Sequence, residues 1–254
     1  QIREFFKDEK IPIIPCSAVQ EINIDLIYEE ILKLPKPERN LNANPIFFVV
    51  RSFDANLPGS DVNSLKGGII GGTLKQGKLK VGDEIEIKPG LPIVKEVQHK
   101  KITEYKELTA KIISLRSENF DLKEALPYGN LGIQTSLDPY ITKSDRIAGC
   151  IVGIKGTLPD VTKKIKFTAR LFEKLVGAEK EEKIEDIKIN ESLLLSINTA
   201  LTLATVKNII RKDEETIIEA DTLTPIVPLP SAIGIARNYL GQWRLIGYGE
   251  LIVE

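Results

Sequence analysis

The sequence predicts a mostly β protein in which a short α/β segment precedes two β-barrels. Polar and apolar residues alternate over residues 78–87, which is the period of half-buried strands. Similar short strand patterns, separated by turn residues, continue to about residue 142 and resume from about residue 148 to residue 253. A segment rich in Pro and Asn, residues 35–44, separates all of them from a strand, turn and helix pattern nearer the N-terminus.

The first segment, residues 1–36, has the pattern of an α/β unit. Residues 1–10 have the composition of the end of a charged helix, and residues 11–15 form a short apolar strand pattern. Residues 16–18 supply the turn after it, and apolar residues then recur at helical spacing over residues 22–34. We therefore expect a strand, a turn and a helix, followed by a linker.

Residues 45–143 predict the first barrel, with strands at residues 45–50, 78–87 and 110–117. A long polar loop, residues 54–64, lies between strands, and loops of this length inside a barrel are usually functional surfaces. Two glycine pairs, Gly67 with Gly68 and Gly71 with Gly72, stand where a strand prefers side chains. Such glycines mark a bulge, a bend, or the close approach of another backbone or a ligand.

Residues 72–79 also fit a phosphate-binding loop except at the last position. That loop needs Ser or Thr at its end to ligate magnesium, and it must join a strand to a helix. Leu79 stands at that position and a strand pattern follows it. We therefore favour a barrel turn at residues 81–83 over a phosphate loop.

Residues 144–254 predict a second all-β unit, a barrel or a sandwich, because several short strands follow one another with turns between them. A single tryptophan in a terminal strand usually fills a barrel core, so we expect Trp243 to be buried. Arg244 beside it is a candidate for a surface or interdomain contact.

Composition excludes several classes of function. The net charge is −1, so any contact with RNA requires a local basic patch. Cys16 and Cys150 lack CxxC spacing and there is one histidine, so we expect no metal site and a reducing, cytoplasmic location. No apolar run reaches the roughly 18 residues of a membrane span. The absence of methionine and the start at Gln1, within a helical pattern, suggest part of a longer protein.

Five stretches, in order and at their spacings, resemble one known family over nearly the whole chain. They are residues 12–18, residues 50–54 with the loop that follows, residues 65–72, residues 192–195 and residues 243–247. The family is the gamma subunit of translation initiation factor two, of archaeal or eukaryotic type. The resemblance implies the C-terminal part of that subunit: the remnant of an α/β GTPase domain followed by two β-barrels, as in translation-factor GTPases.

The resemblance implies a subunit that binds methionyl initiator tRNA in its GTP form and delivers it to the small ribosomal subunit. The alpha and beta subunits of the same factor are its implied partners, and GTP or GDP with Mg²⁺ is the implied cofactor of the intact protein. Ser17 and Ala18 match the family's guanine-recognition loop. The chain lacks the phosphate loop and the other nucleotide motifs, so we expect it to hold no nucleotide and to be inactive as a GTPase alone.

The resemblance further implies a pocket for the 3′ end of the tRNA on the first barrel. Its residues would be Arg51, Phe53, Lys66, Gly67, Gly68, Ile70 and Gly71. The two cations would neutralise phosphates, Phe53 and Ile70 would contact the terminal adenine or the methionyl group, and the glycines would let RNA approach the backbone. Alternatively, Phe53 and Ile70 belong to the barrel core, and the first glycine pair turns a corner.

The polar loop resembles a family insertion that docks the alpha subunit, through Asp54, Asn56, Pro58, Gly59 and Asp61. A flexible solvated loop is the alternative. Asn130, Tyr248 and Asn238 depart from the residues usual in the family. Two other functions remain open: an elongation-type or selenocysteine-specific tRNA carrier, which the long loop and the glycine pairs disfavour, and a non-enzymatic double-barrel binding module.

Overall fold

The computed structural model describes residues 11–36, 38–61, 64–97, 100–127, 129–175, 183–212 and 215–253. The chain divides into two compact units, Gln1–Arg39 and Asn40–Glu254. The helix expected over residues 1–10 and the single histidine, His99, lie outside the described residues.

The first unit contains the predicted helix, which runs from Ile24 to Lys33 (α2). It begins later than expected because Ile22 closes the preceding turn: its N–H donates to the Ser17 carbonyl, and Asn23 adopts a left-handed conformation. The strand expected over residues 11–15 is not formed. A strand needs a hydrogen-bonded neighbour, and the described residues of this unit supply none for these apolar residues.

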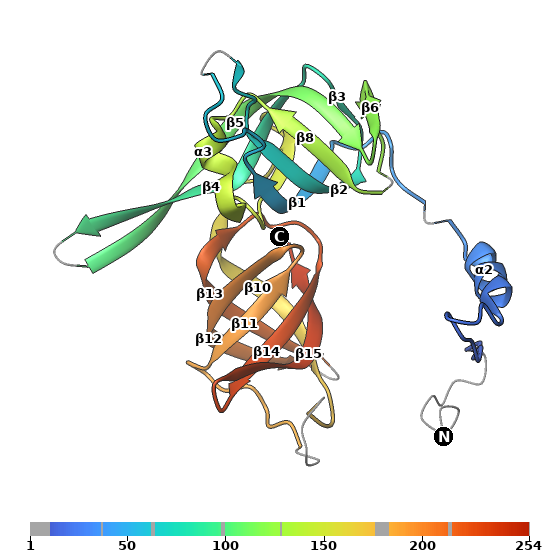
Figure 1. The fold of residues 1–254 in the computed structure, drawn as a ribbon. Helices are drawn as coiled ribbons and strands as arrows, with labels where there is room; N and C mark the ends of the chain where they lie inside the picture. The colour runs from blue at the N-terminus through green and yellow to red at the C-terminus, as the bar shows by residue number, and fades with distance from the viewer. Residues whose placement is uncertain are drawn as a thin grey trace. The chain divides into compact units, whose positions relative to one another are not determined.

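The first barrel of the second unit is confirmed (Figure 1). Its elements are β1 (Ile46–Phe53), β2 (Ile69–Gln76), β3 (Leu79–Lys80), β4 (Glu84–Val97), β5 (Lys100–Ser117), β6 (Phe120–Leu122), β7 (Glu124–Ala125), β8 (Leu131–Thr135), α3 (Pro139–Thr142), η2 (Lys143–Asp145) and β9 (Ile151–Ile154). The sheet order is β4-β9-β1-β2-β8-β5-β6, and pairing of β4 with β5 closes it. The far ends of β4 and β5 project from the barrel as a two-stranded ribbon.

Strand β9 lies beyond residue 143, where the sequence predicted the first barrel to end. It pairs with both β1 and β4, so the first barrel is complete only when this strand is included. Alternation places Phe47 and Val49 of β1 in the barrel core, which is the burial expected of a period-two pattern.

The turn predicted at residues 81–83 is present, with Gly82 at a positive φ of 98° between β3 and β4. Residues 72–79 belong to β2, the turn after it and β3. Because this segment joins strand to strand rather than strand to helix, it is not a phosphate loop.

The second unit's other β segment is a closed barrel rather than a sandwich. Its strands are β10 (Thr162–Leu171), β11 (Ser192–Ile197), β12 (Ala200–Lys212), β13 (Glu215–Ile226), β14 (Ala232–Tyr239) and β15 (Gln242–Ile252). They are ordered β10-β13-β12-β11-β14-β15, and β15 pairs with β10 to complete the ring. Phe167, Leu193, Leu195 and Ile246 fill its centre.

Trp243 is not in that core; 41% of its surface is exposed, so the prediction of burial was wrong. It pairs with Asn238 next to the hairpin turn of β14 and β15. At this position the strand has already passed the end of the barrel interior, which Ile246 and Leu251 fill further along β15.

Apolar residues also join the two barrels. Ile151 of β9, Leu158 and Val227 form a buried cluster, with Phe48 and Leu229 packed against it. The connection between the barrels is therefore a packed joint rather than a free linker. No helix within the described ranges is long and apolar enough to span a membrane.

Candidate nucleic-acid interface

Four neighbouring strands of the first barrel carry a row of two arginines and two glycines. Arg51 on β1 lies opposite Gly71 on β2, which lies opposite Gly132 on β8. Gly132 in turn lies opposite Arg116 on β5. Opposed residues on neighbouring strands share a face of the sheet, so the Cα atoms of Arg51 and Arg116 lie about 15 Å apart with only the two glycines between them in the row. We call these four residues the Arg-Gly-Gly-Arg row.

The row lies on the outer face of the barrel. Successive residues of a strand point to opposite faces of the sheet. The residues next to the row along the strands are fully buried (Ile70, Leu115 and Ile133), so the row residues themselves point outward. Both arginines are exposed, and β1, β2, β8 and β5 lie side by side in Figure 1.

Neither glycine of the row is required by the fold. A Cβ built on Gly71 would have no neighbour closer than 3.9 Å, and one built on Gly132 would meet only the Arg116 carbonyl oxygen, at 3.6 Å. Neither residue has a positive φ. A side chain would fit at both positions, so the flat strip is available to a ligand that comes close to the backbone.

Phe53 lies beside this strip, with its Cε1 atom 3.9 Å from the Cβ position of Gly71. The phenyl ring is 45% exposed, so Phe53 is not a core residue. Ile70 is 0% exposed and belongs to the barrel core, which favours the alternative given for this residue over a contact with RNA. Alternation explains the difference, because Ile70 precedes Gly71 and must point inward.

Gly67 and Gly68 are required by the fold, because neither position has room for a side chain. A Cβ on Gly67 would lie 1.9 Å from the Thr135 carbonyl oxygen, and one on Gly68 would lie 2.5 Å from Thr142 Oγ1. β8 and α3 occupy the space that these side chains would need, which favours the alternative that the glycine pair turns a corner. Gly67 also lines the groove that contains Lys66, and RNA contact at these two glycines stays a prediction.

Asp145 orients the arginine on β1. Its Oδ1 atom accepts from the Ser52 backbone N–H at 2.8 Å and from Arg51 Nε at 3.0 Å. These two donors, the backbone N–H first, hold the pKa of Asp145 below its usual range. Only Nε of Arg51 is engaged by the described residues, so the outer guanidinium nitrogens remain available to an anion.

This geometry predicts a pH-dependent effect of Asp145→Asn. A depressed carboxyl pKa stabilises the fold above the unfolded-state value, near 3.8, and the contribution is lost as pH falls through the folded-state pKa. We expect the variant to unfold at lower urea than the wild type at pH 7, with the gap closing below about pH 4. Asparagine tolerates the positive φ of 58° at this position. A gap that is unchanged between pH 7 and pH 3 would contradict this assignment.

Lys66 is exposed but does not belong to the row. It lies in the loop before β2 and lines a groove together with Tyr140 and Lys143. Its backbone binds Asn56: the Lys66 N–H donates to Asn56 Oδ1 at 2.7 Å, and Asn56 Nδ2 donates to the Lys66 carbonyl at 2.8 Å.

The polar loop is folded rather than free at its base. Asn56 also donates to Asp54 Oδ1, at 2.7 Å from its side chain and 2.9 Å from its backbone. The amide of Asn56 is therefore used to shape the loop, and Asp61 accepts from Ser64 through its carbonyl oxygen. Pro58 and Gly59 form the exposed tip next to Leu57, whose side chain is 78% exposed.

Ser17 and Ala18 lie in the turn before α2 in the first unit. Ser17 pairs with Ile22 through two backbone hydrogen bonds of 3.1 and 3.2 Å, and Ala18 is exposed at the turn. Within the described ranges, no group of three or more His, Cys, Asp or Glu side chains is placed to hold a metal ion.

Gly132 and Arg116 were not predicted as site residues from the sequence. Period-two alternation could place each on an outer strand face, but no local signal reports which residues of β2, β8 and β5 stand opposite one another. The bulges in β1 after Val49 and in β5 after Ile112 shift that register further.

A solved translation factor has a similar fold. The chain is similar to translation elongation factor SelB from Methanococcus maripaludis in its apo crystal structure, with a TM-score of 0.67 over 94% of this chain and 50% of that one. Identity is 16%, so this likeness establishes the fold alone.

The sequence comparisons identify the family. Residues 163–251 match the family model for the C-terminal domain of initiation factor eIF2 gamma. The chain is 43% identical to translation initiation factor 2 subunit gamma from Methanocaldococcus jannaschii, over 99% of this chain and 60% of the relative. For the Pyrococcus horikoshii subunit the identity is 44%, over 98% and 60%. The chain belongs to the gamma-subunit family of translation initiation factor 2, and it spans about 60% of the length of these relatives.

Proposed function

We propose that the intact protein binds methionyl initiator tRNA in its GTP form and delivers it to the small ribosomal subunit in the cytoplasm. In this proposal the chain supplies the surface for the 3′ end of the tRNA. The observation that carries it is the Arg-Gly-Gly-Arg row, which combines two exposed cations with a strip of bare backbone beside an exposed phenyl ring.

Each part of the row matches the chemistry of a single-stranded RNA end. Arg51 and Arg116 neutralise backbone phosphates on either side of the strip, and this contribution falls with rising salt. A base lies against the glycines with its edge or face on Phe53, since stacking on aromatic side chains is the usual way to hold an unpaired base. Lys66, in the neighbouring groove, would contribute a more distant cation.

The nucleotide would be shared with residues outside this chain. Ser17 and Ala18 would approach the guanine, because a turn of small residues lets a base come close to backbone N–H groups. The sequence contains no phosphate loop, so the phosphates and Mg²⁺ of GTP or GDP do not fit any residues present here. Coupling of GTP to tRNA affinity would then require a domain that closes over the row.

The exposed loop tip is the surface we propose for the alpha subunit. Pro58 and Gly59 at the tip, with Asp54 and Asp61 at the two ends of the loop, would make the contact, while Asn56 holds the loop in shape. The beta subunit is the third proposed partner, and no feature of this chain locates its contact.

Side chains added to the strip provide the sharpest test. We expect Gly71→Val in the intact factor to weaken binding of methionyl initiator tRNA by about tenfold or more, because it fills the ligand's space while the fold accommodates it. Arg51→Ala and Arg116→Ala should each weaken binding and each reduce the salt slope by about 1. Equilibrium binding with a GTP analogue across a salt series measures all three.

Arg170→Ala is the matched control, since Arg170 is an exposed arginine on the second barrel paired with Glu215. It should leave the tRNA affinity and the salt slope unchanged. Wild-type affinity in Gly71→Val and in both row-arginine variants would overturn the assignment of the tRNA end to this face.

A further inference from the structure

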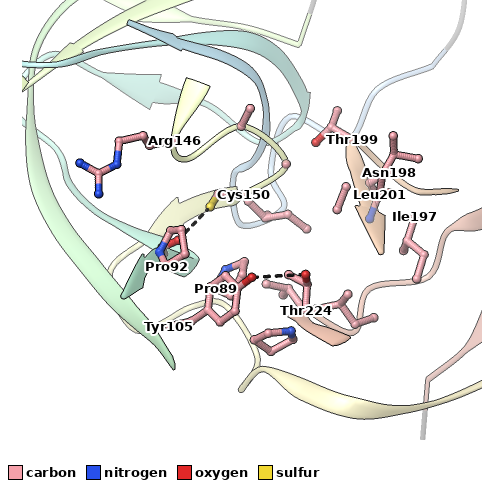
Figure 2. A pocket seen from close by; sticks show the side chains of 18 residues that line it. Pro89, Pro92, Tyr105, Arg146, Cys150, Ile197, Asn198, Thr199, Leu201 and Thr224 are labelled. Atoms are coloured by element: carbon pink, nitrogen blue, oxygen red, sulfur yellow. Dashed lines mark hydrogen bonds between the residues drawn. The ribbon is translucent and has the colours of Figure 1, made fainter. Parts of the chain in front are cut away.

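The two barrels line a partly open cavity of about 280 Å³ within the Asn40–Glu254 unit (Figure 2). The first barrel contributes the bend of β4, Tyr105 of β5 and the segment before β9. The second barrel contributes the turn between β11 and β12 and the end of β13. No residue of the Arg-Gly-Gly-Arg row lines this cavity, so the cavity and the proposed tRNA contact are separate sites.

The walls are mostly apolar, and Arg146 is the one charged residue among those that line the cavity. Pro89, Pro92, Ile197 and Val227 line it together with Cys150. Burial raises the pKa of the Cys150 thiol to about 11, so this wall is neutral at pH 7. Arg146 lines one end, but its guanidinium lies 4.5 Å from the Tyr140 ring and points away from the centre in Figure 2.

One polar atom at the cavity has no partner. Thr199 Oγ1, in the turn between β11 and β12, is buried and makes no hydrogen bond in the described part of the chain. The other hydroxyls nearby are satisfied, since Tyr105 Oη bonds Thr224 Oγ1 across the joint at 3.3 Å. A buried hydroxyl without a partner is costly, and a ligand donor placed there removes that cost.

We propose that this cavity binds a neutral bicyclic aromatic molecule with one hydrogen-bond donor, which Thr199 Oγ1 accepts. Size supports the ring system, because an apolar cavity of roughly 150 Å³ holds benzene, and this one is about twice as large. The guanidinium of Arg146 points away from the centre and the other lining residues carry no charge, which supports a neutral ligand. The unpaired Thr199 oxygen supports a single donor. A bound ligand would contact both barrels and hold them at one relative position.

Indole is the probe, and benzothiophene is the isostere without the donor. Titration of the 254-residue chain, followed by protein NMR shifts, is expected to show saturable indole binding, with benzothiophene about fivefold weaker. Thr199→Val should weaken indole about fivefold and leave benzothiophene unchanged. Thr216→Val, elsewhere in the second barrel, should bind both as the wild type does.

A variant that fills the cavity tests whether indole binds there rather than at another site on the protein. Ala148 lines the cavity yet is exposed at its edge, so Ala148→Phe should keep the fold, checked by its thermal midpoint, and abolish indole binding. Absence of saturable binding by the wild type, or wild-type indole affinity in both Thr199→Val and Ala148→Phe, would overturn the proposal. Should Ala148→Phe unfold, the Thr199→Val comparison with the two probes decides alone.

Discussion

Gly72→Ala is expected to lower the free energy of unfolding by roughly 3 kcal/mol or more. A Cβ on Gly72 would lie 1.9 Å from the Phe48 carbonyl oxygen and 3.1 Å from Phe47 Cζ. The first of these atoms is backbone of β1, so a methyl group fits only if β1 and β2 move apart in the centre of the barrel. Urea unfolding at equilibrium, with the slope fitted alongside the midpoint, measures the loss.

Gly71→Ala is the matched control one residue away. The nearest atoms to its Cβ lie at 3.9 Å, which is ordinary contact. Replacing glycine by alanine in a strand also reduces the entropy of the unfolded chain, so the variant should be as stable as the wild type or slightly more so. Equal losses in both variants would mean that close approach to β1 is not what requires Gly72.

The contrast between the two glycines marks the limit of sequence reasoning. Both stand in one strand pattern, and the sequence signals only that glycine there needs a reason. The reason for Gly72 is a carbonyl 24 residues earlier in the chain, and the reason for Gly71 is the absence of any such neighbour. Only the register of β1 against β2 distinguishes them.

Local patterns predicted most of the barrels correctly. Alternation and turn residues located β1, β3, β4 and the turn at Gly82, because these features depend on neighbouring residues alone. The prediction of a strand at residues 11–15 was wrong because the stability of a strand depends on partner strands. The prediction that Trp243 is buried was wrong because alternation does not indicate where a strand leaves the barrel interior.

The candidate site was predicted in part. Arg51, Phe53 and Gly71 came from the family resemblance, and the structure brings them onto one face. Ile70 was included although alternation alone places it inward. Arg116 and Gly132 join the face through strand pairings between distant segments, for which one sequence carries no signal.

Glu86→Ala is expected to cost roughly 3–5 kcal/mol of unfolding free energy. Glu86 Oε1 accepts from the N–H groups of Thr157 and Leu158, at 2.9 and 2.7 Å, in the segment that connects the two barrels. Its Oε2 lies 3.9 Å from the ammonium of Lys88, which is almost fully buried and also donates to the Leu158 and Pro159 carbonyls. Alanine would leave two N–H groups without an acceptor. It would also remove the most buried of the three carboxylates near the Lys88 ammonium, while the more exposed Glu107 and Asp160 remain at 3.7 Å.

Two further variants test which part of Glu86 matters. Glu84→Ala lies on the same strand, but the ion pair of Glu84 with Lys155 is exposed, so it should cost less than about 1 kcal/mol. Glu86→Gln keeps an acceptor for both N–H groups and removes only the charge, so a loss close to that of alanine would assign the effect to Lys88. A small loss in Gln with a large one in Ala would assign it to the two N–H groups. Removing a buried acceptor of two backbone donors should cost stability. Equal, small losses in Glu86→Ala and Glu84→Ala would therefore show that the contacts of Glu86 do not stabilise the connection between the barrels.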